Sequence, residues 1–376
     1  MRKQPGAALR CAALCPGVAS TQTRAIDNAA RRSHDVPRMF IVDAHLDLAY
    51  NVMRGRDVTK PAAEQPAVDN EIATVGLPDL RRGGVALVCA TIFCPPRNYK
   101  NRGYTTADEA RAIAMEQLTW YRRQVDDGRM NFVVSRGDLP AETEPPASAA
   151  AGPLRFILLM EGADAFRGAG DVAEWYEHGL RIVGLAWRKN RMAGGTGHPG
   201  PLTDEGRAIA RACDRAGIIH DMSHLAEESF WELLYLSSAP VIASHSNCRK
   251  IVPGDRQLSD EMIRAIVQRD GVIGLNFYDE FLLPPEQYKK RRCRMGDVIA
   301  HAKHMTDVIG DARHVALGTD MDGGVGRDDI PFEMTSAADL PVVADHLSAA
   351  GFSDADVRGI MGGNWLRFFR RALPGT

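Results

Sequence analysis

The sequence lacks the features that would assign the protein to a membrane or to nucleic acid. No apolar run reaches about 18 residues, the length that a helix needs to span a bilayer. The last residues, 370–376, lack the hydrophobic tail of a lipid-anchor signal. The formal net charge is only −2, so bulk electrostatics give no reason to expect a nucleic-acid partner. We therefore expect neither a membrane span nor a nucleic-acid partner.

The seven cysteines contain no C-x-x-C pair, and an odd number argues against a complete disulfide framework. Free thiols indicate a reducing compartment, so we expect a cytoplasmic protein. Apolar residues make up 45% of the chain and charged residues 25%, both ordinary for a soluble globular protein. A chain of 376 residues is long enough for one large domain or two ordinary ones.

The first 38 residues differ in composition from the rest of the chain. No acidic residue precedes Asp27, arginine is frequent, and Cys15 and Pro16 interrupt the short apolar run that a signal peptide would need. A transit-like segment and a true start at Met39 are both open. We expect residues 1–38 to be disordered or loosely attached.

Eight short apolar runs recur along the rest of the chain, a pattern typical of strands buried on both faces. They occupy residues 41–47, 85–93, 155–161, 181–187, 217–224, 241–245, 271–278 and 314–320. Helix-patterned segments lie between most of them, including residues 107–124, 204–216, 226–237, 259–269 and 295–309, and another, 354–373, ends the chain.

Eight buried strands that alternate with helices predict an α/β fold, a TIM-type (β/α)8 barrel over residues 39–376. An open doubly wound sheet is the structural alternative. Its usual supports, a G-x-G-x-x-G motif directly after a strand or a P-loop, are not found.

Residues that can bind a metal stand at the ends of five of these runs. They are His45 with Asp47, Glu161, His224, His245 and Asp320. Each has an ordinary explanation alone, such as a hydrogen-bonded histidine or a helix cap, but coincidence at five strand ends is much less expected. Active sites of TIM barrels lie at the C-terminal strand ends. This set can hold two metal ions if one carboxylate bridges them, and two such ions can activate a hydroxide.

Seven stretches also carry a family resemblance in their order and spacing. They are VDAHLD (42–47), LLMEG (158–162), IIHDMSH (218–224), VIASHS (241–246), VIGLNFY (272–278), ALGTDMDG (316–323) and GIMGGNWLRFF (359–369). The chain resembles the renal (membrane) dipeptidase family of zinc peptidases, within the amidohydrolase-like barrels, over about residues 40–369.

The resemblance implies a binuclear zinc dipeptidase with a small-molecule substrate, and it leaves a homodimer open. It implies that His45 and Asp47 bind one zinc ion, that Glu161 bridges both ions, and that His224 and His245 bind the other. In the family pattern, Asp320 is the acid/base that moves the proton, and Arg256 holds the substrate carboxylate. The same ligands also suit manganese or iron.

One position departs from the family pattern. Trp187 stands where the family's dipeptidases carry a histidine that contacts the scissile carbonyl, and an indole cannot be protonated near neutral pH. Arg188, Lys189, Asn190 and His198 are nearby substitutes. Two alternatives stay open: a metal-dependent hydrolase of another amide, ester or lactone, and a non-catalytic binding protein on the same scaffold.

Overall fold

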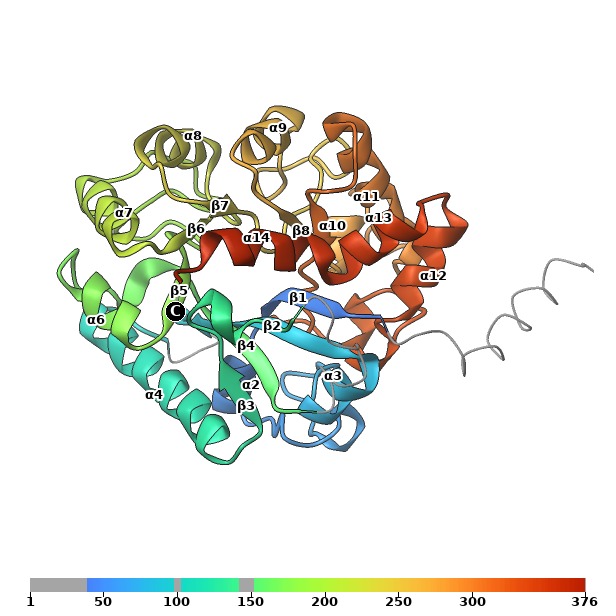
Figure 1. Cartoon of the computed structure of the whole chain (residues 1–376), viewed down its shortest axis with the longest axis horizontal. Helices are drawn as coiled ribbons and strands as arrows, with labels where there is room; N and C mark the ends of the chain where they lie inside the picture. The colour runs from blue at the N-terminus through green and yellow to red at the C-terminus, as the bar shows by residue number, and fades with distance from the viewer. Residues whose placement is uncertain (1–38, 98–102, 142–151, 376) are drawn as a thin grey trace, which may run out of the picture. The chain divides into compact units, whose positions relative to one another are not determined.

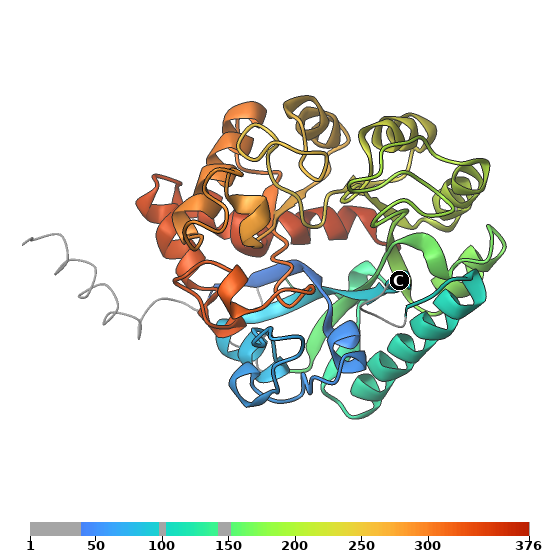
Figure 2. The ribbon, with the colours of Figure 1, turned by 180° about the vertical axis from the view of Figure 1, so that it is seen from behind.

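The computed structural model describes residues 39–97, 103–141 and 152–375, which belong to one compact unit. The expectation that residues 1–38 are disordered or loosely attached falls outside these residues. Figures 1 and 2 show the described part from opposite sides.

Parallel strands form one sheet in the order β7-β6-β5-β4-β2-β1-β9-β8, and β3, which is not part of this path, pairs with β4. The strands are β1 (Ile41–Leu46), β2 (Val85–Phe93), β3 (Met130–Phe132), β4 (Leu154–Glu161), β5 (Leu180–Gly184), β6 (Ile219–Asp221), β7 (Val241–Ile242), β8 (Ile273–Leu275) and β9 (Val315–Leu317). A parallel bridge between Ala243 and Ile273 joins the two ends of the path. The predicted (β/α)8 barrel is therefore confirmed, and the short β3 is an addition that was not predicted.

Helices follow the strands and surround the sheet (Figure 1). They are α2 (Leu48–Met53), α3 (Leu77–Gly83), α4 (Ala107–Asp126), α6 (Asp171–Glu177), α7 (Asp204–Ala216), α8 (Glu227–Leu236), α9 (Asp260–Gln268), α10 (Asp279–Leu282), α11 (Met295–Ile309), α12 (Val342–Ala349), α13 (Asp354–Arg358) and α14 (Asn364–Ala372). The predicted bounds of α7 and α11 agree with the structure. No helix in the described part combines the length and apolar character that crossing a bilayer requires.

The continuous apolar runs arise because both faces of each strand are buried. In β2, Leu87 and Cys89 belong to the cluster inside the barrel, whereas Val88 and Ala90 belong to the cluster under the outer helices. Side chains alternate along a strand, so a strand between two apolar layers needs apolar residues at nearly every position. A polar residue at a strand end is therefore conspicuous in this sequence.

Helix α14 closes one end of the barrel. Its Trp365, Phe368 and Phe369 are buried and pack in the same cluster as inward residues of the strands, such as Val42 and Leu159. Figure 1 shows α14 lying across the barrel, and Figure 2 shows it behind the strands, on the far side from the viewer. The indole of Trp365 donates a hydrogen bond to the carbonyl of Leu317, 2.8 Å away, which ties the helix to β9.

The last predicted helix, residues 354–373, is not continuous. A π-helical turn, Gly359–Gly363, separates α13 from α14, and Gly362 leaves the helical conformation. A Cβ atom at Gly362 would stand 2.7 Å from the carbonyl oxygen of Phe40. The glycine therefore lets this turn approach the start of β1, and the helical periodicity of the sequence gave no sign of the break.

Candidate metal centre

All six residues predicted at strand ends lie together at the barrel end opposite α14. His45 is in β1, Glu161 ends β4, and Asp47, His224, His245 and Asp320 follow β1, β6, β7 and β9 within three residues. Each is at most 9% exposed. The predicted juxtaposition is therefore present in the fold, although six such polar groups are costly to bury without partners.

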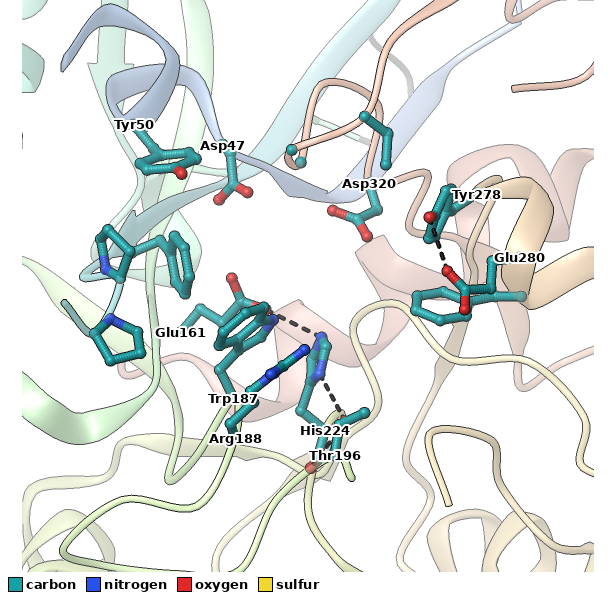
Figure 3. A pocket seen from close by; sticks show the side chains of 17 residues that line it. Asp47, Tyr50, Glu161, Trp187, Arg188, Thr196, His224, Tyr278, Glu280 and Asp320 are labelled. Carbon is teal, nitrogen blue, oxygen red and sulfur yellow. Dashed lines mark hydrogen bonds and ion pairs between the residues drawn. The ribbon is translucent and has the colours of Figure 1, made fainter. Parts of the chain in front are cut away.

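Three imidazoles converge on the carboxylate of Glu161. Its oxygens lie 3.6 Å from Nε2 of His45, 3.2 Å from Nε2 of His224 and 3.5 Å from Nε2 of His245. The Nε2 atoms of His224 and His245 are only 2.9 Å apart. Figure 3 shows Glu161 and His224 facing one another across the pocket wall. Nitrogen and oxygen donors this close together are the arrangement that a divalent cation needs.

The structure contains two groups of three residues whose ligand atoms, within each group, all lie within 4.8 Å of one another. One group is His45, Glu161 and His245, and the other is His45, Asp47 and Asp320. Nε2 of His45, common to both, is buried and has no hydrogen-bond partner in the described part. A buried nitrogen without a partner is costly unless something else binds it. The donor set therefore fits a metal ion, and imidazole with carboxylate suits zinc, manganese or iron.

The charges of this cluster shift the pKa values of its members. Burial acts against a charged His45, but Glu161 and the neighbouring aspartates outweigh it and raise the pKa of His45 to about 10. Burial raises the pKa of Asp47 to about 6 and that of Asp320 to about 7. The negative field that raises the pKa of His45 would equally attract a metal cation.

Two members of the cluster have a strained backbone. His224 has a φ of 66° and Asp320 a φ of 59°, the left-handed region that side chains other than glycine seldom enter. Such strain is concentrated at functional sites, where the surrounding structure imposes it. In both residues it follows the end of a strand and turns the side chain into the pocket.

A buried polar layer orients the predicted ligands, and sequence reasoning missed it. Oγ of Ser244 donates to Asp221 and lies 3.2 Å from Nδ1 of His45 and 2.7 Å from Nδ1 of His245. Since the hydroxyl proton goes to Asp221, we infer that both rings donate Nδ1–H to Ser244, which leaves Nε2 of each ring as the atom that would bind a metal ion. The only sequence signal was that Asp221 and Ser244 stand inside the IIHDMSH and VIASHS stretches.

Other contacts hold the remaining members of the cluster. Thr91 donates to Asp47, and the amide of Asn276 donates to Asp320 over 2.9 Å. Thr196, in the glycine-rich segment after β5, lies 2.9 Å from Nδ1 of His224. These contacts hold the side chains of Asp47, Asp320 and His224 in place.

A cavity of about 430 Å³ opens over the centre. Asp47, Glu161, His224 and Asp320 form its floor, and Tyr50 and Trp187 lie at its side (Figure 3). Phe93 also lines the cavity. The ring of Trp187 packs edge-on against Phe93, with ring centroids 5.3 Å apart. Trp187 therefore faces the site, as its alignment with the family's histidine predicted, whereas His198 is exposed and does not line the cavity.

Arg256 is close to the centre but is held by the protein itself. Its guanidinium donates to the carbonyl of His245 over 2.6 Å and to Oγ of Ser246 over 3.2 Å. It is 6% exposed, lies 4.9 Å from the ring centroid of Phe281, and is not among the residues that line the cavity. Its Nε has no hydrogen-bond partner in the described part. The predicted role of Arg256 in binding a substrate carboxylate thus stays a prediction.

Comparisons with known proteins agree with this architecture. A protein of Klebsiella pneumoniae encoded in the pqqA 5′ region is 30% identical over 253 residues, which are 65% of this chain and 89% of that protein. The solved structure of dipeptidase AC, a metallopeptidase of family M19, is 25% identical, with a TM-score of 0.75 over 89% of this chain and 99% of that one. A metallopeptidase from Rhodobacter sphaeroides, solved with a phosphinate mimic of the dipeptide L-Ala-D-Ala, is 26% identical, with a TM-score of 0.74 over the same shares.

The model of one protein family, described as membrane dipeptidase (peptidase family M19), matches residues 30–373. This match spans most of the sequence and includes every residue of the centre. The chain therefore belongs to the membrane dipeptidase family of metallopeptidases, M19.

Proposed function

We propose that this protein is a binuclear zinc dipeptidase. The observation that carries the proposal is the convergence of three imidazole Nε2 atoms on Glu161. One of them, Nε2 of His45, is buried and has no hydrogen-bond partner in the described part. His45 and Asp47 would hold one ion, His224 and His245 the other, and Glu161 would bridge them. When bound, two zinc ions would lower the pKa of a water molecule enough for it to act as a nucleophile on a peptide carbonyl near neutral pH.

Asp320 is the proposed acid/base. Its carboxylate accepts the proton of the attacking water and then delivers it to the leaving amine. Burial raises the pKa of Asp320 to about 7, so its carboxylate holds a proton more readily than an exposed aspartate does. The hydrogen bond from Asn276 occupies one carboxylate oxygen and leaves the other for the transfer. The acidic positions on the floor of the cavity thus divide into ligands and one proton carrier.

Dipeptides are the proposed substrates because the Rhodobacter sphaeroides relative was solved with a mimic of L-Ala-D-Ala. A second candidate, hydrolysis of another amide, an ester or a lactone, is favoured by Trp187 in the cavity and by the engagement of Arg256 with His245 and Ser246. A non-catalytic binding protein would be expected to have a broken ligand set, and here the set is complete. A cytoplasmic location and a homodimer remain predictions; the five cysteines of the described part are free and buried.

The test is a hydrolysis screen of the purified protein with and without zinc. The substrates are dipeptides of mixed stereochemistry, their C-terminal amides, N-acyl amino acids and lactones. We expect zinc-dependent cleavage of dipeptides and about two ions per chain by metal analysis. Full zinc occupancy with turnover of lactones or N-acyl amino acids alone would instead support the second candidate.

A further inference from the structure

Arg188 occupies the rim of the cavity, in the segment that follows β5. Its Cζ lies 5.0 Å from the centroid of the Trp187 ring, a distance at which a guanidinium is attracted to an indole face. Figure 3 shows its side chain running past Trp187 toward the middle of the pocket. The residue is exposed, so its charge is accessible to a ligand that enters from solvent.

The charges around the cavity are unequal. Its lining contains four carboxylates, from Asp47, Glu161, Glu280 and Asp320, but Arg188 is its only arginine or lysine in the described part. The carboxylates have protein partners; Glu280, for example, accepts a hydrogen bond from Tyr278 over 2.8 Å. Arg188 has no hydrogen bond or ion pair with any other described residue, so its fork of N–H donors is free for a ligand.

We propose that Arg188 binds a carboxylate in the side chain of the substrate, so that the protein prefers dipeptides containing aspartate or glutamate. This inference rests on the proposed dipeptidase function and names its substrate class. A guanidinium binds a carboxylate with two parallel charged hydrogen bonds. Because the Arg188 side chain already packs on the indole of Trp187, it loses less conformational entropy when it binds a ligand. Its place on the exposed rim suits a substituent that varies between substrates, whereas the terminal carboxylate is common to all dipeptides.

The experiment compares kcat/KM of the zinc-loaded protein for Ala-Ala, Ala-Asp, Asp-Ala and Ala-Lys, with L and D forms of the second residue. We expect at least about a tenfold preference for an Asp-containing dipeptide over Ala-Ala, seen mainly in KM. Arg188→Gln should remove that preference by lowering kcat/KM for the Asp-containing dipeptides more than for Ala-Ala. Arg188→Glu should invert it in favour of Ala-Lys, a gain that a folding defect cannot produce.

Lys189→Glu is the matched control, because Lys189 is an exposed neighbour that does not line the cavity. It makes the same change of charge and should leave the ranking of substrates intact. The proposal is overturned if the wild-type protein cleaves Ala-Ala as well as Ala-Asp, if Arg188→Gln slows all dipeptides equally, or if Lys189→Glu shifts the ranking as much. No cleavage of any dipeptide by the zinc-loaded wild type would contradict the proposed function itself.

Discussion

The two ends of the barrel contain opposite kinds of side chain, polar at one end and apolar at the other. At the C-terminal strand ends, six buried residues are histidines or carboxylates, and two of them, His224 and Asp320, have left-handed backbones. At the other end, α14 fills the barrel with Trp365, Phe368 and Phe369, which are buried in an apolar cluster. The same strands therefore carry polar groups that are costly to bury at one end and a close-packed aromatic core at the other.

This contrast indicates that the residues proposed for catalysis and the residues that stabilise the fold lie largely at opposite ends of the strands. Buried charges and strained residues lower the stability of a fold unless a ligand or a partner compensates them. Close packing of large apolar side chains raises it. Substitutions at the C-terminal strand ends should therefore change metal binding or turnover. Substitutions among the residues that pack against α14 should change the free energy of unfolding.

The largest effect is expected from Glu161→Gln. The amide keeps the shape of the side chain but removes the negative charge that faces three imidazoles. We expect zinc content, measured by metal analysis, and dipeptide turnover to be lost together. Glu280→Gln makes the same change at a carboxylate on the rim of the same cavity and should keep its zinc. An active Glu161→Gln protein with a full complement of zinc would refute the bridging role.

Asp320→Asn should show whether metal binding and proton transfer depend on different residues of the metal centre. An amide cannot carry the proton, so kcat should fall by about 10²–10⁴-fold, the usual contribution of general acid–base catalysis. Zinc content should stay the same because Asp320 is not one of the proposed ligands. The atoms of Asp320 do lie within reach of His45 and Asp47. Loss of one zinc ion per chain would thus reassign Asp320 as a ligand.

Trp365→Ala tests the opposite end. Removal of a fully buried tryptophan leaves a cavity and breaks its hydrogen bond to Leu317, so the free energy of unfolding should fall by about 3–5 kcal/mol. Unfolding of the wild-type and Trp365→Ala proteins by denaturant, after a chelator has removed their metal, measures this change. Trp231→Ala, at a tryptophan that is 37% exposed, should cost far less. The separation of the two ends fails if folded Trp365→Ala protein binds zinc markedly more weakly than wild type.

The barrel was predictable from the sequence because each strand is a short apolar run that ends abruptly in polar residues. His45, Glu161 and His224 were chosen as candidate ligands for the same reason, because a histidine or glutamate at a strand end is out of place in an apolar layer. Helical periodicity, by contrast, continues through Gly359–Gly363, where the helix is broken beside the carbonyl of Phe40. Contacts between distant strands leave no periodic signal.

Ser244 is the clearest case of such a contact. A serine in a buried run predicts nothing by itself, and its role depends on three side chains that come from β1, β6 and the end of β7. Its hydroxyl has one proton and two acceptor sites, and the contacts with Asp221, His45 and His245 use all three. The tautomers of two proposed ligands are therefore set by a residue that binds no metal.

Ser244→Ala should produce the smallest of these effects. Without the hydroxyl, both Nδ1–H groups lose their acceptor and both rings lose their fixed orientation, so we expect zinc affinity to fall by about 10–100-fold. Competition with a chelator measures the affinity directly and does not depend on turnover. Ser246→Ala removes another buried hydroxyl, one that contacts Ser223 and Arg256 but no imidazole, and should leave zinc affinity nearly unchanged. Equal zinc affinity in Ser244→Ala and wild type would mean that the strands alone orient His45 and His245, and the polar layer would then belong with α14 among the features that stabilise the barrel.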